Sequence, residues 1–284
     1  MNVLSISGAL YFWCVCVCLA ARQVDSLRGG HVFGVTMLND RLYVLREREL
    51  DQTRFGLDVY STVNSAWQLV QVLIVDGQDL RDIASCATHQ CLYVCDFGAK
   101  SVKKLRSDGS KVSSWPVDEA PVGISVSPNK CNVLIASGES SKLLELDRES
   151  GRLVRSINLP EEVVSPRHAI LLPDGHILVS HGEHDVHMVC EIRGDTVIRS
   201  FGNDVDSEMR KLSLPCQMAV DKDGFVFVAD CWNDRVVLLS PSLELVREIR
   251  DLGDCPRRLC LDHFHRTKLR LFVGLDDKLT VIEL

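Results

Sequence analysis

The chain has 284 residues, of which 46% are hydrophobic, and a formal net charge of −7. This length and hydrophobic content suffice for a large core, in one extended domain or in two smaller ones. The acidic balance disfavours generic binding to nucleic-acid phosphates, because such contacts need an excess of Lys and Arg, although it is compatible with a local basic patch. Balanced hydropathy and the absence of low-complexity tracts exclude long disordered segments.

The first 21 residues form an apolar N-terminal segment that we separate from the remainder, 22–284. Its stretch 8–20, GALYFWCVCVCLA, has about the length of a signal-peptide core and is too short for a comfortable membrane span. Cys18 and Ala20 fit the small-residue rule for cleavage, but no Lys or Arg precedes the stretch, and the chain contains no Asn-x-Ser/Thr acceptor. A cleaved signal of a secreted protein and a ragged end of a cytoplasmic one both stay open, and the cytoplasmic location is favoured.

The chain contains twelve cysteines, three of them in the apolar N-terminal segment. The other nine are an odd number and lie mostly within strand-like apolar runs, so we interpret them as free buried cysteines in a reducing compartment. None of them has the doubled Cys-x-x-Cys spacing of a structural zinc site. The nine are Cys86, Cys91, Cys95, Cys131, Cys190, Cys216, Cys231, Cys255 and Cys260.

A repeated pattern of short apolar strands begins near residue 30 and continues through the chain. The clearest copy, 215–249, is predicted to form four strands, with turns at Asp223-Gly224 and Pro241-Ser242 and a polar segment between the second and third strands. First-strand prolines recur at intervals of 45, 49 and 41 residues, at Pro121, Pro166, Pro215 and Pro256. In chain order the copies span 33–49, 83–105, 121–147, 166–192, 215–249 and 256–284.

Six sheets of this kind, each apolar on both faces, are stable only if each packs against its neighbours. We therefore predict an all-β fold, a six-bladed β-propeller whose blades are four-stranded antiparallel sheets. The period-2 alternation and the scarcity of long helical patterns exclude a helical solenoid. The last copy lacks a fourth strand, and the segment RQVDSL at 22–27 is predicted to supply it, because an open ring would expose two apolar edges.

The polar segment of the clearest copy is predicted to hold its hairpin in register. Asp230 ends the second strand, and Asn233 and Arg235 flank the turn into the third. Asp and Asn side chains bind nearby backbone amides, and an Arg at this place bridges to a carboxylate such as Asp230. Together with Asp221 and Gly224 of the preceding turn, these residues form a structural repeat motif.

This copy resembles the NHL repeat, in which Pro, an apolar strand ending in Asp, Gly, Val-Ala-Asp, Asn and Arg follow at fixed spacing. The matching residues are Pro215, Val220, Asp221, Gly224, Val228, Ala229, Asp230, Asn233, Arg235 and Val236. In the fourth copy, His181 and His184 stand at the Asp and Asn positions. The resemblance implies a propeller similar to that of TRIM-NHL proteins, but no RING, B-box or coiled-coil segment precedes the first blade, so we infer no ligase activity.

The second residue after each first-strand proline is predicted to point toward the central channel. These residues are Gly123, His168, Gln217 and Arg258, with Gly34 and Ala84 in the copies without proline. Our candidates for binding at the channel mouth are Arg258, Gln217, His168 and Asp82. The resemblance extends to the peptide-amidating lyases, in which several channel histidines hold zinc, but only one of these positions is His here. The other metal candidates, His181, His184 and His187, are expected in a solvated loop, so no metal or cofactor is predicted.

We therefore predict a non-enzymatic, monomeric interaction platform whose loops dock a protein or peptide partner. RNA is a second partner class, which the net charge does not support. No Gly-x-Ser-x-Gly elbow or Gly-rich phosphate loop is present. The alternative is a secreted, metal-dependent propeller enzyme of the amidating-lyase or lactonase type. No membrane span is predicted.

Overall fold

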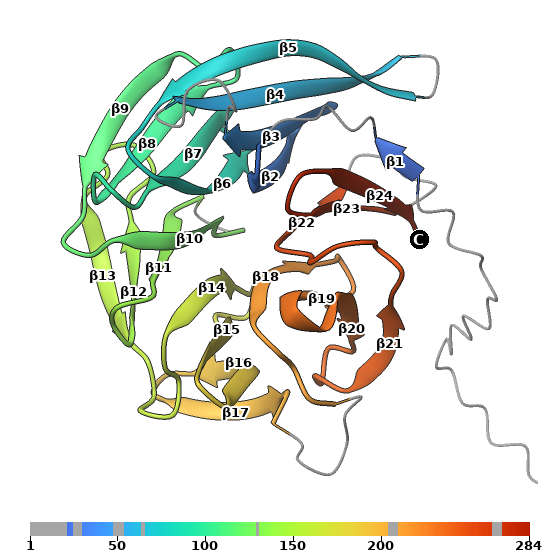
Figure 1. The fold of residues 1–284 in the computed structure, drawn as a ribbon. Coiled ribbons are helices and arrows are strands. Elements are labelled where there is room, and N and C mark those ends of the chain that lie inside the picture. The colour runs from blue at the N-terminus through green and yellow to red at the C-terminus, as the bar shows by residue number, and fades with distance from the viewer. Residues whose placement is uncertain are drawn as a thin grey trace, which may run out of the picture.

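The fold of the chain is a ring of six four-stranded antiparallel sheets around a central axis (Figure 1). A computed structural model describes residues 22–24, 30–47, 54–63, 66–128, 131–203, 210–262 and 269–284. The predicted six-bladed propeller is confirmed. None of the helices in this part of the chain is long and apolar enough to span a membrane.

The strands run from the inside of each blade to its outside. Blade 1 consists of β2 (Val32–Leu38), β3 (Arg41–Glu47), β4 (Arg54–Val63) and β5 (Ala66–Asp76). Blade 2 consists of β6 (Leu80–Cys86), β7 (Cys91–Asp96), β8 (Ser101–Arg106) and β9 (Lys111–Pro116). Blade 3 consists of β10 (Pro121–Val126), β11 (Val133–Ser137), β12 (Lys142–Leu146) and β13 (Leu153–Asn158). Blade 4 consists of β14 (Pro166–Leu171), β15 (Ile177–Glu183), β16 (Val186–Arg193) and β17 (Thr196–Phe201). Blade 5 consists of β18 (Pro215–Val220), β19 (Val226–Asp230), β20 (Arg235–Leu239) and β21 (Leu245–Ile249), and blade 6 of β22 (Arg258–Asp262), β23 (Arg270–Gly274), β24 (Leu279–Glu283) and β1 (Arg22–Val24).

The core is divided among the interfaces between blades. The described part of the chain has six clusters of buried apolar side chains, and each cluster combines residues of two adjacent blades. Strands β7 and β19 are buried at every position because a neighbouring blade covers each of their faces, whereas the outer strand β13 is largely exposed. Each blade is therefore stabilised by its neighbours rather than by a core of its own.

The two ends of the chain share the last blade. β1 pairs antiparallel with β24, with Arg22 opposite Val281 and Val24 opposite Leu279 (Figure 1). This pairing confirms the predicted closure for residues 22–24, while residues 25–27 of the predicted strand lie outside the described residues. The apolar segment 1–21 also lies outside them, so the boundary at residue 22 stays a prediction.

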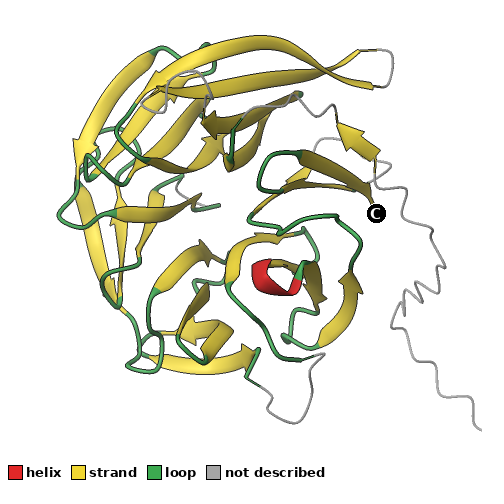
Figure 2. Cartoon of the chain, viewed as in Figure 1, coloured by secondary structure: helices red, strands yellow, loops and turns green. Residues whose placement is uncertain are grey.

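The ring has two ends with different loops. We call the end that carries the links between blades and the loop 231–234 the upper end, and the end that carries the hairpin loops 87–90 and 127–132 the lower end. The single described helix, η1 (Cys231–Asn233), lies at the upper end of blade 5 (Figure 2). Each inner strand therefore starts at the upper end and runs toward the lower end.

A disulfide joins Cys231 of η1 to Cys255 in the link to blade 6. The prediction that these cysteines are free is wrong for this pair. The link between blades 5 and 6 runs at the upper end of the ring, and so it brings Cys255 next to Cys231. Seven other described cysteines are free, and five of them are buried.

The structure gathers the residues of the predicted repeat motif into one hydrogen-bonded group. The buried Asp230 carboxylate accepts bonds from Ser213 N (2.6 Å), Asn233 Nδ2 (2.8 Å) and Arg235 Nε (2.6 Å). One bond thus reaches back to the link before β18, and two hold the turn into β20. In the preceding turn, Asp221 Oδ1 accepts from two backbone amides, and Gly224 adopts a φ of 86°.

Candidate functional site

Six equivalent positions of the inner strands surround the channel near the upper end. In blades 1 to 4 the inner strand has a bulge after its first residue, and the equivalent position follows that bulge. In blade 5 the irregularity extends from Pro215 to Met218, and Gln217 lies within it. In blade 2 this position is held by Asp82, which pairs with Cys95. Ala84, the residue predicted there, packs instead into the core between blades 2 and 3. The six positions are Gly34, Asp82, Gly123, His168, Gln217 and Arg258.

The carboxylate of Asp82 is the centre of a buried network among these positions. It accepts hydrogen bonds from Ile83 N (2.9 Å) and Ile124 N (3.0 Å). The Gln217 Nε2 group donates to both of its oxygens at 3.2 and 3.4 Å, at the weak end of the normal range. Gln217 Oε1 in turn accepts from Leu259 N at 2.8 Å. One carboxylate thereby connects the inner strands of blades 2, 3 and 5, and Gln217 adds blade 6.

Arg258 and His168 complete this group. Arg258 donates through Nε to the backbone oxygen of Phe33 and through Nη2 to that of Arg81 at 2.7 Å, so it bridges blades 6, 1 and 2. His168 Nδ1 accepts from Met218 N at 3.4 Å. We call Asp82, His168, Gln217 and Arg258 the channel cluster. The four candidates proposed from the sequence are therefore brought together by the inner strands of four different blades.

Two of the six channel positions, Gly34 and Gly123, leave no room for a side chain. A Cβ atom on Gly34 would lie 2.6 Å from Ile83 Cγ2, and one on Gly123 would lie 2.1 Å from the backbone oxygen of Arg167. Real Cβ atoms do not approach other atoms this closely, so neighbouring inner strands meet at these points only because no side chain is present. Neighbouring inner strands are therefore closely packed beside the channel cluster.

Burial shifts the ionisation of both titratable members of the channel cluster. Burial raises the pKa of Asp82 to about 6, although the Arg258 charge and the hydrogen bonds from Ile124, Ile83 and Gln217 oppose the rise. Burial, followed by the Arg258 charge, lowers the pKa of His168 to about 4. At pH 7 the cluster therefore holds a largely ionised carboxylate and a neutral imidazole, and a small change in its surroundings protonates Asp82.

Two further arginines adjoin the channel cluster in the chain. Arg167 and Arg257 each directly precede a cluster residue. Arg257 Nε is paired with Asp276 at 2.7 Å, whereas Arg167 Nε is buried without a hydrogen-bond partner. The charge that acts on both Asp82 and His168 is that of Arg258. Arg258 is therefore the cation of the channel cluster.

The donors of the channel cluster do not fit a divalent metal ion of the amidating-lyase kind. The cluster offers one carboxylate, one imidazole and one amide, and the Arg258 guanidinium already compensates the carboxylate charge. A zinc site needs about three strong donors without a competing cation among them. We therefore assign no metal to the channel.

The three histidines considered as metal candidates do not converge on one point. His181 is fully buried, and its Nε2 lies 3.1 Å from Cys190 Sγ. Both ring nitrogens of His187 bind the backbone, Nδ1 accepting from Leu214 N (2.7 Å) and Nε2 lying 2.7 Å from the oxygen of His184. The His184 side chain is 87% exposed. His181 pairs with Pro166 as Asp230 pairs with Pro215, so it occupies the motif position of blade 4.

Sequence reasoning missed a second group of reactive side chains at the lower end, namely Cys86, His89 and Cys131, whose ligand atoms all lie within 4.8 Å of one another. The short run Cys86, His89 and Cys91 was its only local signal. Cys131 belongs to the next blade, so spacing in the sequence does not reveal the group.

Comparison with known proteins identifies the fold. No family model matches the chain, and no curated protein matches its sequence. Among solved structures, hydrazine synthase from Kuenenia stuttgartiensis is 15% identical with a TM-score of 0.63, and the match covers 98% of this chain and 99% of that one. A streptogramin B lyase is 10% identical with a TM-score of 0.62, covering 92% and 96%. A catalytically inactive virginiamycin B lyase from Staphylococcus aureus, in which alanine replaces a histidine, was solved with quinupristin; it is 11% identical with a TM-score of 0.62, covering 94% and 99%.

These neighbours correct one expectation and leave another untested. The expectation of a non-enzymatic chain is overturned, because proteins with the same propeller over nearly their whole length include lyases. At these identities the likeness extends to the fold alone, since one fold supports many activities. The resemblance to the NHL repeat has no matching family model and stays a prediction.

Proposed function

We propose that this chain is a propeller enzyme of the lyase class and that the channel cluster is its acid–base site. The observation that carries the proposal is a carboxyl group with a pKa of about 6 beside an arginine, both held by inner strands at the channel. A general acid or base is most effective when its pKa lies near the working pH. Two of the structural neighbours are lyases, which supports this class over the others.

The proposed reaction is an elimination next to a carbonyl group. The ionised Asp82 removes a proton from carbon, the electron pair of that C–H bond forms a C=C bond, and the leaving group departs with the electrons of its own bond. Arg258 binds the carbonyl oxygen and stabilises the negative charge that develops on it. Gln217 releases Asp82 as substrate enters, because its two bonds to the carboxylate are long. The proposed reaction consumes no water and requires no metal ion.

Quinupristin, present in one neighbouring structure, is the first compound to test, together with a panel of peptide esters and lactones. Elimination adds no water, so the product masses sum to the substrate mass, whereas hydrolysis adds one water molecule. We expect Asp82→Asn and Arg258→Met each to lower turnover by about 10²-fold or more. Asp174→Asn, which changes a carboxylate that is 60% exposed in blade 4, is the matched control and should keep full turnover. Turnover unaffected by Asp82→Asn, or products with added water, would refute the proposal.

A second candidate function, docking of a protein or peptide partner at the upper end, has one specific observation in its favour. Trp232 on η1 is 64% exposed, and its ring lies 5.9 Å from that of His187. Exposed aromatic anchors are typical of binding surfaces. We expect Trp232→Ala to reduce capture of a specific partner without changing the melting temperature. Equal capture by both proteins would remove this candidate.

The disulfide between Cys231 and Cys255 supports the secreted alternative for location, because disulfides persist in oxidising compartments. The mass of the mature protein tests this proposal. Removal of the apolar segment 1–21 is expected, and an intact N-terminus would contradict it.

A further inference from the structure

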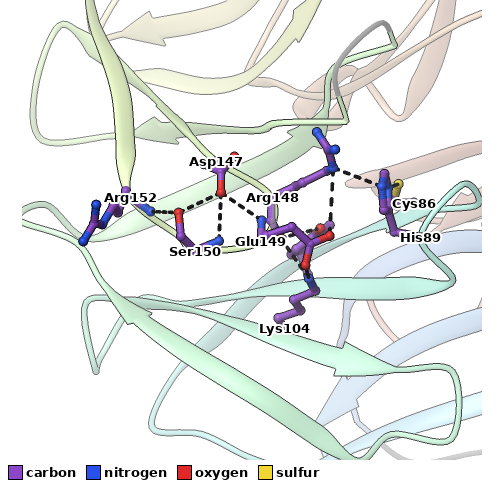
Figure 3. Close-up of polar contacts among 9 residues, drawn as sticks. Cys86, His89, Lys104, Asp147, Arg148, Glu149, Ser150 and Arg152 are labelled. Atoms are coloured by element: carbon purple, nitrogen blue, oxygen red, sulfur yellow. Dashed lines mark hydrogen bonds and ion pairs between the residues drawn. The ribbon is translucent and has the colours of Figure 1, made fainter.

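Three side chains that bind soft metals meet at the lower end, between blades 2 and 3. Cys86 ends β6, His89 lies in the hairpin loop that follows, and Cys131 precedes β11 of the next blade. Their ligand atoms lie within 4.8 Å of one another, and Cys86 Sγ is 3.2 Å from His89 Nδ1. Figure 3 shows Cys86 and His89 next to each other, with Arg148 reaching His89. The group is distant in the fold from the channel cluster, which lies near the upper end.

The backbone brings these side chains together by local structure on both blades. Cys86 pairs with Cys91 across the hairpin, so the four residues between them form a tight loop that returns His89 to the end of β6. Cys131 adopts a φ of 55°, a left-handed conformation that few non-glycine residues take, and its N donates to the oxygen of Ser127 at 3.0 Å. The hairpin loops of blades 1 and 2 also hold a residue in this conformation, Asn39 and Gln90, so the conformation belongs to the turn and places Cys131 at its end.

The group opens on one side to solvent. Cys86 is buried, whereas His89 and Cys131 line a cavity of about 610 Å³ with Thr88, Pro128, Asn132 and Arg148. Two ligands thus face the cavity, and the third closes the site from within the protein. A metal ion held by all three would have its fourth position toward the cavity.

We propose that Cys86 Sγ, Cys131 Sγ and His89 Nδ1 bind one zinc-type divalent ion, with an open fourth position. Two sulfurs and one imidazole select zinc or a similar soft ion and disfavour magnesium and calcium, which take oxygen ligands. Both thiols release their protons to solvent when the ion binds. The ion links the hairpin loops of two blades, so its binding also stabilises the ring.

Binding of the ion through His89 Nδ1 requires a rearrangement of the side chains behind the ring. Arg148 Nε donates to His89 Nε2 at 3.0 Å, which leaves the ring proton on Nδ1 toward Cys86 (Figure 3). When Nδ1 binds the ion, the proton moves to Nε2 and Arg148 must withdraw. Glu149 lies 3.9 Å from Arg148 Nε and is held by Lys104 Nζ at 2.8 Å. Its carboxylate would then accept a hydrogen bond from the Nε2–H group, and the proton would stay on the ring. Histidine ligands of metals commonly donate their second N–H in this way.

The test uses the full chain, reduced with a phosphine, freed of metal by a chelator and titrated with Co²⁺ and then Zn²⁺. We expect one Co²⁺ per chain, with thiolate-to-cobalt charge-transfer absorption that Zn²⁺ abolishes. Cys131→Ser and His89→Ala should each weaken Zn²⁺ binding by at least about 10-fold. Cys260→Ser, which removes a free cysteine of blade 6, is the matched control and should bind as the unchanged chain does.

A second readout keeps the proposal falsifiable if a variant fails to fold. In the unchanged chain, Zn²⁺ should protect Cys86 and Cys131 from alkylation and raise the melting temperature. Absence of charge-transfer absorption, uptake unaffected by Cys131→Ser, or alkylation of both cysteines at saturating Zn²⁺ would each overturn the proposal. A disulfide among Cys86, Cys91 and Cys131 that resists the phosphine would overturn it too.

Discussion

Replacement of Arg235 by methionine tests how the repeat motif stabilises blade 5. The side chain is 1% exposed and donates to Asp230 Oδ2 (2.6 Å), Glu248 Oε1 (2.5 Å) and the oxygen of Lys211 (2.6 Å). Methionine fills a similar volume but donates none of these bonds. The fully buried Asp230 carboxylate then keeps only its bonds from Ser213 and Asn233.

The expected loss follows from the buried charge left behind. Removal of one partner of a buried ion pair typically costs about 3–5 kcal/mol, because the other charge stays desolvated. Burial already raises the pKa of Asp230, against the opposing hydrogen bonds from Ser213, Asn233 and Arg235. We therefore expect Arg235→Met to lower the free energy of unfolding by about 4 kcal/mol.

Urea unfolding followed by tryptophan fluorescence measures this loss. Arg257→Met is the matched control, because Arg257 is 44% exposed and its partner Asp276, at 2.7 Å, is 34% exposed. Exposed pairs of this kind contribute about 0–1 kcal/mol. The double variant Asp230→Asn with Arg235→Met should lose less than the sum of the single variants, since it removes the stranded charge. A cost for Arg235→Met no greater than that of the control would show that the buried bonds of Arg235 do not stabilise blade 5.

Three further predictions concern the ring as a whole. Burial lowers the pKa of His168 and of His181 to about 4, below the 6.5 of an exposed histidine, so protonation of either ring opposes folding. The free energy of unfolding should therefore fall as the pH drops from 6.5 to 4, by about 3 kcal/mol per histidine, and protonation of Asp82 offsets part of this loss. A melting temperature independent of pH in this window would contradict the prediction. Deletion of residues 22–24 should lower the melting temperature because it exposes the edge of β24, and an unchanged melting temperature would refute the closure. Gly123→Ala should lower the free energy of unfolding by about 1–3 kcal/mol. Gly138→Ala is the control and should lower it less, because the new Cβ would lie no closer than 3.6 Å to any atom. Equal losses in urea unfolding would show that space at the channel is not limiting.

The fold could be predicted because its signals are local and repeated. Short apolar strands, turn residues and recurring first-strand prolines define the blade, and six blades that are apolar on both faces leave a closed ring as the stable arrangement. The same periodicity identifies His168, Gln217 and Arg258 as equivalent channel positions. It assigns blade 2 wrongly to Ala84, because Leu80 stands where blades 3 and 4 have the first-strand proline, so no proline marks the start of this inner strand.

The contacts between blades could not be predicted from the sequence. The disulfide joins Cys231 and Cys255, 24 residues apart, through a link whose path depends on packing. Cys131 likewise meets Cys86 and His89 only because blades 2 and 3 lie side by side. The activity of the chain is even harder to predict from the sequence, because a propeller fold is compatible with both binding and catalysis.

The proposed function depends most directly on the ionisation of Asp82. Infrared difference spectra of the unchanged chain and Asp82→Asn, recorded across pH 3 to 9, would isolate the C=O stretching band of this one carboxyl group. The band should disappear with a midpoint near pH 6 as the carboxyl group ionises. A midpoint near 3.8, the ordinary value for aspartic acid, would contradict a buried acid–base group at the channel.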